Sequence, residues 1–190
     1  MTLFRTAGPG AEPVTLAEAK AELRVDHGSE DDLIGGLIRA AREEVEQTTE
    51  LAMIEQGWRL AIDRMPGNCR VLLRRGPVRA ISAVTAYGRD GEAALLEPSD
   101  YQLDPLSRPA RLHFEVAPGD LRIFNGIEID FTAGYGEAAT DVPDLLKRAV
   151  LMLVAHWFEF RASFGQSQQP VSIPEGYRRL LASFMARRLD

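Results

Sequence analysis

The chain has 190 residues, of which 45% are hydrophobic and 26% are charged, the balance of a globular protein with one sizeable core. Its single cysteine, Cys69, excludes an intrachain disulfide. No stretch approaches the roughly 20 apolar residues that a membrane span requires, and the N-terminus lacks the apolar core of a signal peptide. We therefore expect a cytoplasmic protein with no membrane partner.

The formal net charge of −6 is unevenly distributed along the chain. Residues 1–56 contain 5 basic and 12 acidic side chains, whereas residues 141–190 contain 7 basic and 5 acidic ones. This distribution argues against a nucleic-acid-binding module, which needs a clustered positive face. An acidic N-terminal segment and a mildly basic C-terminal segment are compatible with head-to-tail contacts between copies.

Two helices are predicted near the N-terminus. Thr15 and Glu18 have the spacing of a capping box, which predicts a helix that begins there and runs to about Arg24. A second helix is expected to start at Ser29, because apolar residues then recur at spacings of three and four. Gly35-Gly36 inside it suggests that another backbone approaches closely.

From about Gln56 the apolar period changes from near four to two, which is typical of strands. Short alternating segments separated by glycine, proline and asparagine turns continue to Phe131. Alternation with one buried and one solvated face predicts a small antiparallel β lobe, either a barrel or a sandwich.

The helical period returns at Asp141, a plausible N-cap, with Pro143 in the first turn of a helix running to about Phe164. Residues 165–170 have the composition of a linker. A last helix, rich in arginine, is predicted from about Glu175 to Arg188.

These elements predict an α+β fold, in which N-terminal and C-terminal helices form a bundle with an inserted β lobe. We divide the chain into an N-terminal helical part (1–56), the β lobe (57–140), the central helix and linker (141–174) and a C-terminal docking segment (175–190).

His156 and Glu159 lie three residues apart in the otherwise apolar stretch VAHWFEF. A zinc site needs further ligands, and neither His27 nor His113 has ligand spacing to His156. We therefore interpret this stretch as a packing helix that meets the core or a neighbouring subunit. Its packing residues are expected to be Leu145, Ala149, Met152, Leu153, His156, Trp157 and Phe160.

Arg70, Arg74, Arg75 and Arg79 form a local basic cluster around a turn. Such clusters are usually solvated, and the alternative is a docking patch for an acidic partner. The sequence contains no P-loop, nucleophile elbow or paired-cysteine zinc pattern.

The order of several segments resembles the head–tail connector, or adaptor, family of long-tailed phages, prophages and gene transfer agents. These segments are PVTLAEAKAELRVDHGSEDDLIGGLIRAAREEVEQTT, RGPVRAISAVTAYG, FTAGYG, VPDLLKRAVLMLVAHWFEFR and IPEGYRRLL.

The resemblance implies a structural particle protein with no catalytic residues and no cofactor. Such adaptors form a ring, typically dodecameric, that binds the portal protein and presents a surface to the next connector or tail, with DNA passing through. The protein would assemble in the host cytoplasm and remain at the head–tail junction.

The resemblance also suggests roles for particular residues. Portal docking is expected of Tyr177, Arg178, Arg179, Leu180, Leu181, Phe184, Arg187 and Arg188. In a ring, Glu43, Glu44 and Glu46 could face the channel and repel passing DNA.

Two alternatives remain open. The chain could be another ring of the same junction, a stopper or tail terminator, although those are mostly β. It could instead be a small metalloenzyme that uses His156 and Glu159.

Overall fold

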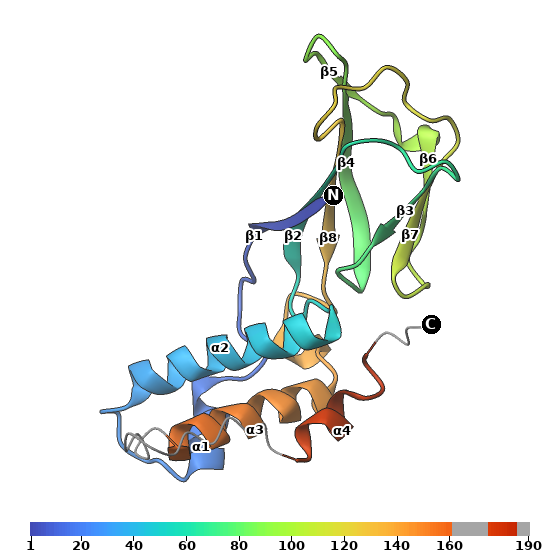
Figure 1. Cartoon of the computed structure of the whole chain (residues 1–190). Helices are drawn as coiled ribbons and strands as arrows, with labels where there is room; N and C mark the ends of the chain where they lie inside the picture. Colours follow the sequence, from blue (N-terminus) through green and yellow to red (C-terminus); the bar gives the residue numbers. More distant parts are fainter. Residues whose placement is uncertain (161–174, 186–190) are drawn as a thin grey trace, which may run out of the picture. The chain divides into compact units, whose positions relative to one another are not determined.

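The computed structural model describes residues 1–160 and 175–185, and the chain divides into two compact units (Figure 1). The β unit comprises Met1–Gly10 and Glu55–Tyr135, and the helical unit comprises Ala11–Ile54 and Gly136–Asp190. Helices and antiparallel sheets are both present, so the predicted α+β class is confirmed. The first ten residues differ from the prediction, because they belong to the β unit and not to an N-terminal helical part.

The helical unit contains four α-helices among its described residues, α1 (Leu16–Leu23), α2 (Asp31–Thr49), α3 (Asp144–Phe160) and α4 (Tyr177–Leu181). The helix α3 packs against each of the other three, and α1 also contacts α2. A short 3-10 helix, η2 (Ala139–Asp141), precedes α3.

The capping box predicted for α1 is present. The Thr15 hydroxyl accepts a hydrogen bond from the Glu18 backbone N–H at 3.2 Å, and the Glu18 carboxylate accepts one from the Thr15 N–H at 2.7 Å. Together they satisfy two N–H groups that have no partner inside the helix. The helix ends at Arg24, whose φ of 56° is left-handed.

The helix α2 starts two residues later than predicted. Ser29 does not cap it, because its hydroxyl bonds to Nδ1 of His27 at 2.8 Å. The face that α2 buries contains Ile34, Ile38, Ala41 and Val45, as the spacing predicted. The expected close approach at Gly35-Gly36 is absent from the described residues, since only the Arg39 guanidinium would meet an added Cβ, at 3.7 Å or more.

A buried ion pair lies near the C-terminal end of α2. The Arg42 guanidinium donates to the carboxylates of Glu46 at 2.9 Å and Glu12 at 2.8 Å, and only 3% of its side chain is exposed. Burial lowers the pKa of a guanidinium, but the carboxylates of Glu46 and Glu12 outweigh that effect and raise the pKa of Arg42. The Glu46 carboxylate also accepts a hydrogen bond from the Met53 N–H at 2.9 Å. It therefore connects α2 to the segment that follows the helix.

The predicted start of the central helix at Asp141 is wrong. The Asp141 carboxylate accepts a bond from the Ala138 N–H at 3.0 Å, which closes η2, and α3 begins at Asp144, after Pro143. Proline tolerates this place because its nitrogen has no hydrogen to donate.

The β unit consists of two antiparallel sheets. The larger sheet has the strand order β1-β2-β8-β4-β5 and the smaller one β3-β7-β6. The strands are β1 (Thr2–Ala7), β2 (Gln56–Ile62), β3 (Arg70–Leu73), β4 (Val78–Tyr87), β5 (Ala93–Leu95), β6 (Tyr101–Asp104), β7 (Ala110–Phe114) and β8 (Ile127–Ala133). A 3-10 helix, η1 (Pro98–Asp100), precedes β6.

The alternation in the sequence matches the register of the strands. In the larger sheet Leu60 lies opposite Ile129, and both are buried, whereas the neighbouring pair Arg59 and Asp130 is only partly covered. In the smaller sheet Val71 lies opposite Leu112, and both are buried. Each sheet therefore has one apolar face and one polar face.

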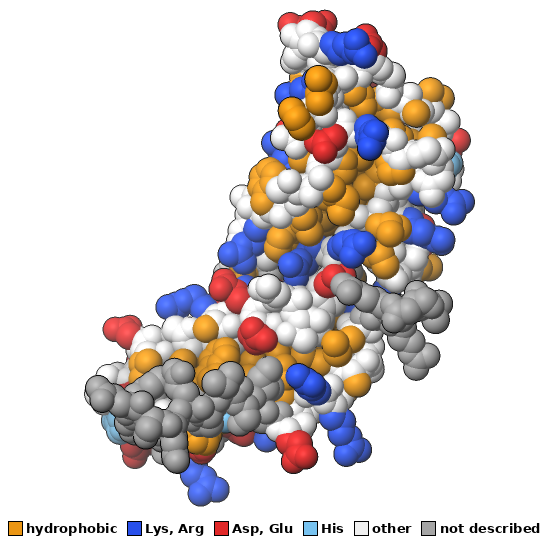
Figure 2. All heavy atoms as spheres, in the orientation of Figure 1, with side chains coloured by type: hydrophobic (Ala, Val, Ile, Leu, Met, Phe, Trp, Pro, Cys, Tyr) orange, Lys and Arg blue, Asp and Glu red, His pale blue; other side chains and the backbone are white. Residues whose placement is uncertain are grey.

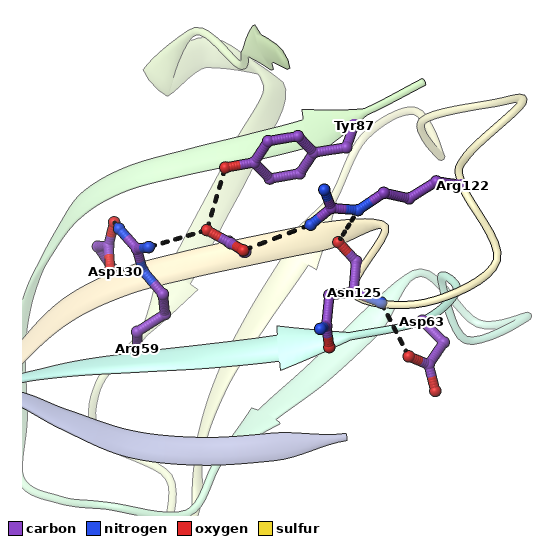
Figure 3. A network of polar contacts seen from close by, with 7 residues as sticks. Arg59, Asp63, Tyr87, Arg122, Asn125 and Asp130 are labelled. Carbon is purple, nitrogen blue, oxygen red and sulfur yellow. Dashed lines mark hydrogen bonds and ion pairs between the residues drawn. The ribbon is translucent and has the colours of Figure 1, made fainter. Parts of the chain in front are cut away.

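A polar network covers one face of the larger sheet (Figure 3). Glu128 on β8 accepts from the Tyr87 hydroxyl at 3.1 Å and pairs with Arg59 on β2 at 2.9 Å. Arg122 reaches the same carboxylate at 3.5 Å, and its guanidinium lies 3.8 Å above the centre of the Tyr87 ring. Arg122 also donates to the carbonyl of Asn125 at 2.9 Å, so the network orders the loop before β8.

The glycines of the AGYG stretch have two different roles. Gly134 has a φ of +147°, which L side chains rarely adopt. A Cβ at Gly136 would overlap the carboxylate of Asp141, the residue that closes η2. Neither position tolerates a side chain without rearrangement.

The capping box yields a first prediction. Replacing Thr15 with alanine should lower the free energy of unfolding by about 1 kcal/mol, because one helix N–H loses its partner. The hydrogen bonds from Thr15 lower the pKa of Glu18 below its ordinary 4.5. The difference in the free energy of unfolding between wild type and variant should therefore have its full value above pH 4.5. It should shrink as the pH falls below that value. Urea unfolding at several pH values measures both effects.

The control is Glu18→Gln, which keeps the capping geometry but has no carboxylate to protonate. The free energy of unfolding of this variant should lack the part of the pH dependence that Glu18 contributes in wild type. A pH dependence in this control equal to that of wild type would contradict the assignment.

A second prediction concerns the buried pair. Glu46→Ala should destabilise the protein by about 3 kcal/mol, because it leaves the buried Arg42 undercompensated and the Met53 N–H without its acceptor. Glu43→Ala is the control, since Glu43 reaches the same guanidinium at 3.4 Å with 58% of its side chain exposed. This control should cost less than about 1 kcal/mol. Equal losses in chemical denaturation would refute the buried-pair assignment.

Candidate functional site

The packing face predicted for α3 is partly correct. Ala149 and Leu153 are buried, together with Leu146, Val150 and Val154. Leu145 is 49% exposed and Phe160 39% exposed, so both lie outside the core of this chain, and their contact with a neighbouring subunit stays a prediction. The buried stripe follows Leu146 and Val150, one position along the helix from the predicted one.

The remaining predicted packing residues, Met152, His156 and Trp157, are half-buried. The His156 ring packs against Phe160, with 4.6 Å between the ring centres, whereas Glu159 is exposed. No group of three histidine, cysteine, aspartate or glutamate side chains among the described residues is placed to hold a metal ion. Within the same residues, no helix is both long and apolar enough to cross a membrane.

The C-terminal segment is only partly available for docking. Tyr177 is 1% exposed and Leu181 0%, so both are core residues of the helical unit, and burial raises the pKa of Tyr177 to about 12. The helix α4 is also shorter than predicted, with a C-cap at Ala182. Arg178 and Arg179 are exposed, and Leu180 and Phe184 are half-buried. Arg187 and Arg188 lie outside the described residues.

The three acidic residues proposed for a channel do not share one environment. Glu46 is buried against Arg42 and cannot face a channel, which corrects that prediction. Glu43 is exposed, and Glu44 is half-buried and accepts from the Thr48 hydroxyl at 3.3 Å. For Glu43 and Glu44 the channel role stays a prediction.

The predicted arginine cluster divides into residues of two kinds. Arg75 lies over the Trp58 ring at 4.6 Å, and Arg79 pairs with Glu55 at 2.7 Å. Arg70 and Arg74 instead line a groove of about 580 Å³ in the β unit, together with Arg64 and Arg111. We call this surface the basic groove.

A second groove of about 570 Å³ lies elsewhere in the β unit. Asp90, Glu92 and Asp100 line it, with the exposed side chains of Leu95 and Val116 among them. We call these five residues the acidic edge. Sequence reasoning missed this surface because its residues come from three separate stretches that only the fold brings together.

Hydrophobic side chains are exposed on the β unit beside charged ones (Figure 2). The apolar side chains exposed by more than half in this unit include Leu95, Leu106, Val116, Ile123 and Phe124. Contiguous exposed apolar side chains with a polar rim are typical of interaction surfaces. These exposed apolar side chains and the two grooves are candidate docking surfaces.

Comparison with known proteins points to one class. Residues 13–75, which include α1, α2, β2 and β3, match the family model described as phage gp6-like head-tail connector protein. No curated protein sequence matches the chain.

Solved structures match the chain over its whole length. A subunit of the neck of an empty gene transfer agent (GTA) particle, computed with C6 symmetry, has a TM-score of 0.85 and 25% identity. A subunit of the virion of a native GTA particle has a TM-score of 0.82 and 26% identity. A subunit of the neck of a native GTA particle, computed with C12 symmetry, has a TM-score of 0.78 and 25% identity. Each match covers 100% of this chain and 97% of the other.

The family match covers α1, α2, β2 and β3. The structural matches cover both units. These findings agree with the resemblance found in the sequence. The family match and the structural matches together support a head–tail connector protein.

Proposed function

We propose that this protein forms a ring of twelve copies at the neck of a phage or GTA-like particle, where it joins the DNA-filled head to the tail. The observation that carries the proposal is the likeness of the whole chain to a neck subunit from a particle with C12 symmetry. The role is structural, and DNA passes through the ring as cargo.

The portal protein is the proposed partner of the C-terminal segment, and the next connector or a tail protein is the proposed partner on the other side. Arg178 and Arg179 support the portal assignment, since both are exposed beside the buried anchors Tyr177 and Leu181. Anchoring by two core side chains holds the exposed arginines in place, which lowers the entropy lost on docking. Arginine pairs well with carboxylates on a partner.

A stopper or tail terminator remains the second candidate for this chain. The adaptor role is favoured because the family match includes α1 and α2, and the described part of the helical unit contains four α-helices.

The ring proposal predicts a definite copy number. Particles that contain DNA should be purified from induced source cells, and this protein should be counted against the portal protein by quantitative mass spectrometry. We expect equal numbers of the two, twelve of each, as C12 symmetry requires. Absence of the protein from such particles would refute the structural role.

The portal assignment predicts the effect of charge reversal. Arg178→Glu together with Arg179→Glu should weaken binding to purified portal at least about tenfold, because juxtaposed like charges cost several kcal/mol at an interface. The fold should persist, since both side chains are exposed. Arg39→Glu, an exposed site on α2, is the control and should bind normally. Unchanged portal binding by the double variant would remove the C-terminal segment from the interface.

A further inference from the structure

The basic groove contains arginines that the described residues leave without an ionic partner. Arg64, Arg70 and Arg74 form no ion pair with any described residue, whereas Arg111 is paired with Asp104. Asp63, the acidic residue in the lining, accepts the Asn125 N–H at 2.9 Å. The groove is therefore strongly positive in a chain whose net charge is −6.

The groove is also apolar at its base. Ile62 and Val71 are buried residues of its lining, and Leu72 between the arginines is 40% exposed. Arginines around an apolar surface are typical of protein interfaces, where the apolar part is desolvated and the charges select the partner. A nucleic-acid backbone would leave this apolar surface unused.

The acidic edge has the opposite charge and a similar apolar content. Asp90, Glu92 and Asp100 form no ion pair with any described residue. Among the described residues, the carboxylates of Asp90 and Asp100 accept hydrogen bonds from the backbone N–H groups of Glu92, at 3.1 Å, and Glu97, at 2.9 Å. Leu95 is 68% exposed and Val116 75% exposed among these carboxylates.

The strand order places the two surfaces on different strands of the β unit. In the larger sheet, the basic groove borders β1 and β2, and the acidic edge borders β4 and β5. In the smaller sheet, β3 supplies the basic groove, and the acidic edge lies at Asp100, just before β6. Arg111 on β7 also lines the basic groove, and in the larger sheet β8 separates the two surfaces, since Ile62 and Ala86 lie on either side of Ile127.

We propose that neighbouring copies of this protein associate head to tail through their β units, with the acidic edge of one copy docked in the basic groove of the next. The three arginines would pair with the three carboxylates, and Leu95 and Val116 would cover the apolar base around Leu72. The proposal rests on the proposed ring and names the contact that closes it.

A contact between two different surfaces of the same chain is heterologous, and it generates a ring when the rotation between copies closes. Two separate surfaces with opposite charge meet this requirement, because each copy presents both. Like surfaces repel each other, so a two-fold dimer through either surface is disfavoured.

Charge reversal tests the contact in purified protein. Arg74→Glu or Glu92→Arg alone should raise the concentration at which half of the protein is assembled at least about tenfold, because like charges then meet. The matched controls are Arg39→Glu and Glu137→Arg, exposed residues outside both surfaces, and they should assemble as wild type does. Light scattering and native mass spectrometry measure the assembly.

Mixing the two variants gives the decisive result. The glutamate of the first variant can meet the arginine of the second, and the native arginines of the second can meet the native carboxylates of the first. An equimolar mixture, and the variant that carries both changes, should therefore assemble as wild type does. Failure of both to recover, while the controls assemble normally, would overturn the proposed contact.

A crosslink tests the same contact in assembled particles, whether or not the free protein oligomerises. Leu72→Cys and Leu95→Cys are combined with Cys69→Ser, and the particles are treated with a short bis-maleimide. We expect the protein with both cysteines to give a ladder of covalently linked multimers. A variant with either cysteine alone should give monomers and at most dimers. Twelve copies per particle without a ladder would overturn the head-to-tail contact and leave the ring intact. Particles that lack the protein would instead refute the proposed function.

Discussion

The packing of α2 against α3 is the constraint on which the rest of the molecule depends. These helices belong to segments of the chain that are separated by the β unit, so the core of the helical unit forms only when both segments meet. Ile34, Ile38 and Val45 on one helix and Leu146, Val150 and Leu153 on the other are buried. Closure of so long a loop costs entropy, and burial of these apolar side chains offsets it.

The buried pair of Arg42 and Glu46 strengthens this arrangement in a specific way. Glu46 binds both a guanidinium on its own helix and the Met53 N–H, just before the chain enters the β unit. A buried pair contributes little net stability but is costly to break, so it favours one arrangement of the chain over others. The network around Glu128 is partly exposed, and it orders the loop that contains Arg122 and Asn125 in the β unit.

A connector protein that forms a ring must bind copies of itself and other particle proteins, and the proposed contact between copies depends on the distribution of its charges. The net charge of −6 gives no indication of the basic groove, because the chain has both a surplus of carboxylates and local arginines without partners. Charges on separate surfaces of a rigid sheet can select orientation as well as partner. In the proposed contact, the exposed apolar side chains beside these charges supply the apolar area that is buried.

The sequence by itself determined the class of fold, the capping box of α1, the buried stripe of α2 and the alternation of the strands, because each of these depends on residues close together in the chain. The order of its segments also indicated the connector family. Only the tertiary structure decided that Thr2–Ala7 join the sheet, that Tyr177 and Leu181 are core residues and that Glu46 is buried. It also decided which arginines share a groove and which pair elsewhere, as Arg79 does with Glu55. Burial and ion pairing depend on residues far apart in the sequence, and their proximity is created only when the chain folds.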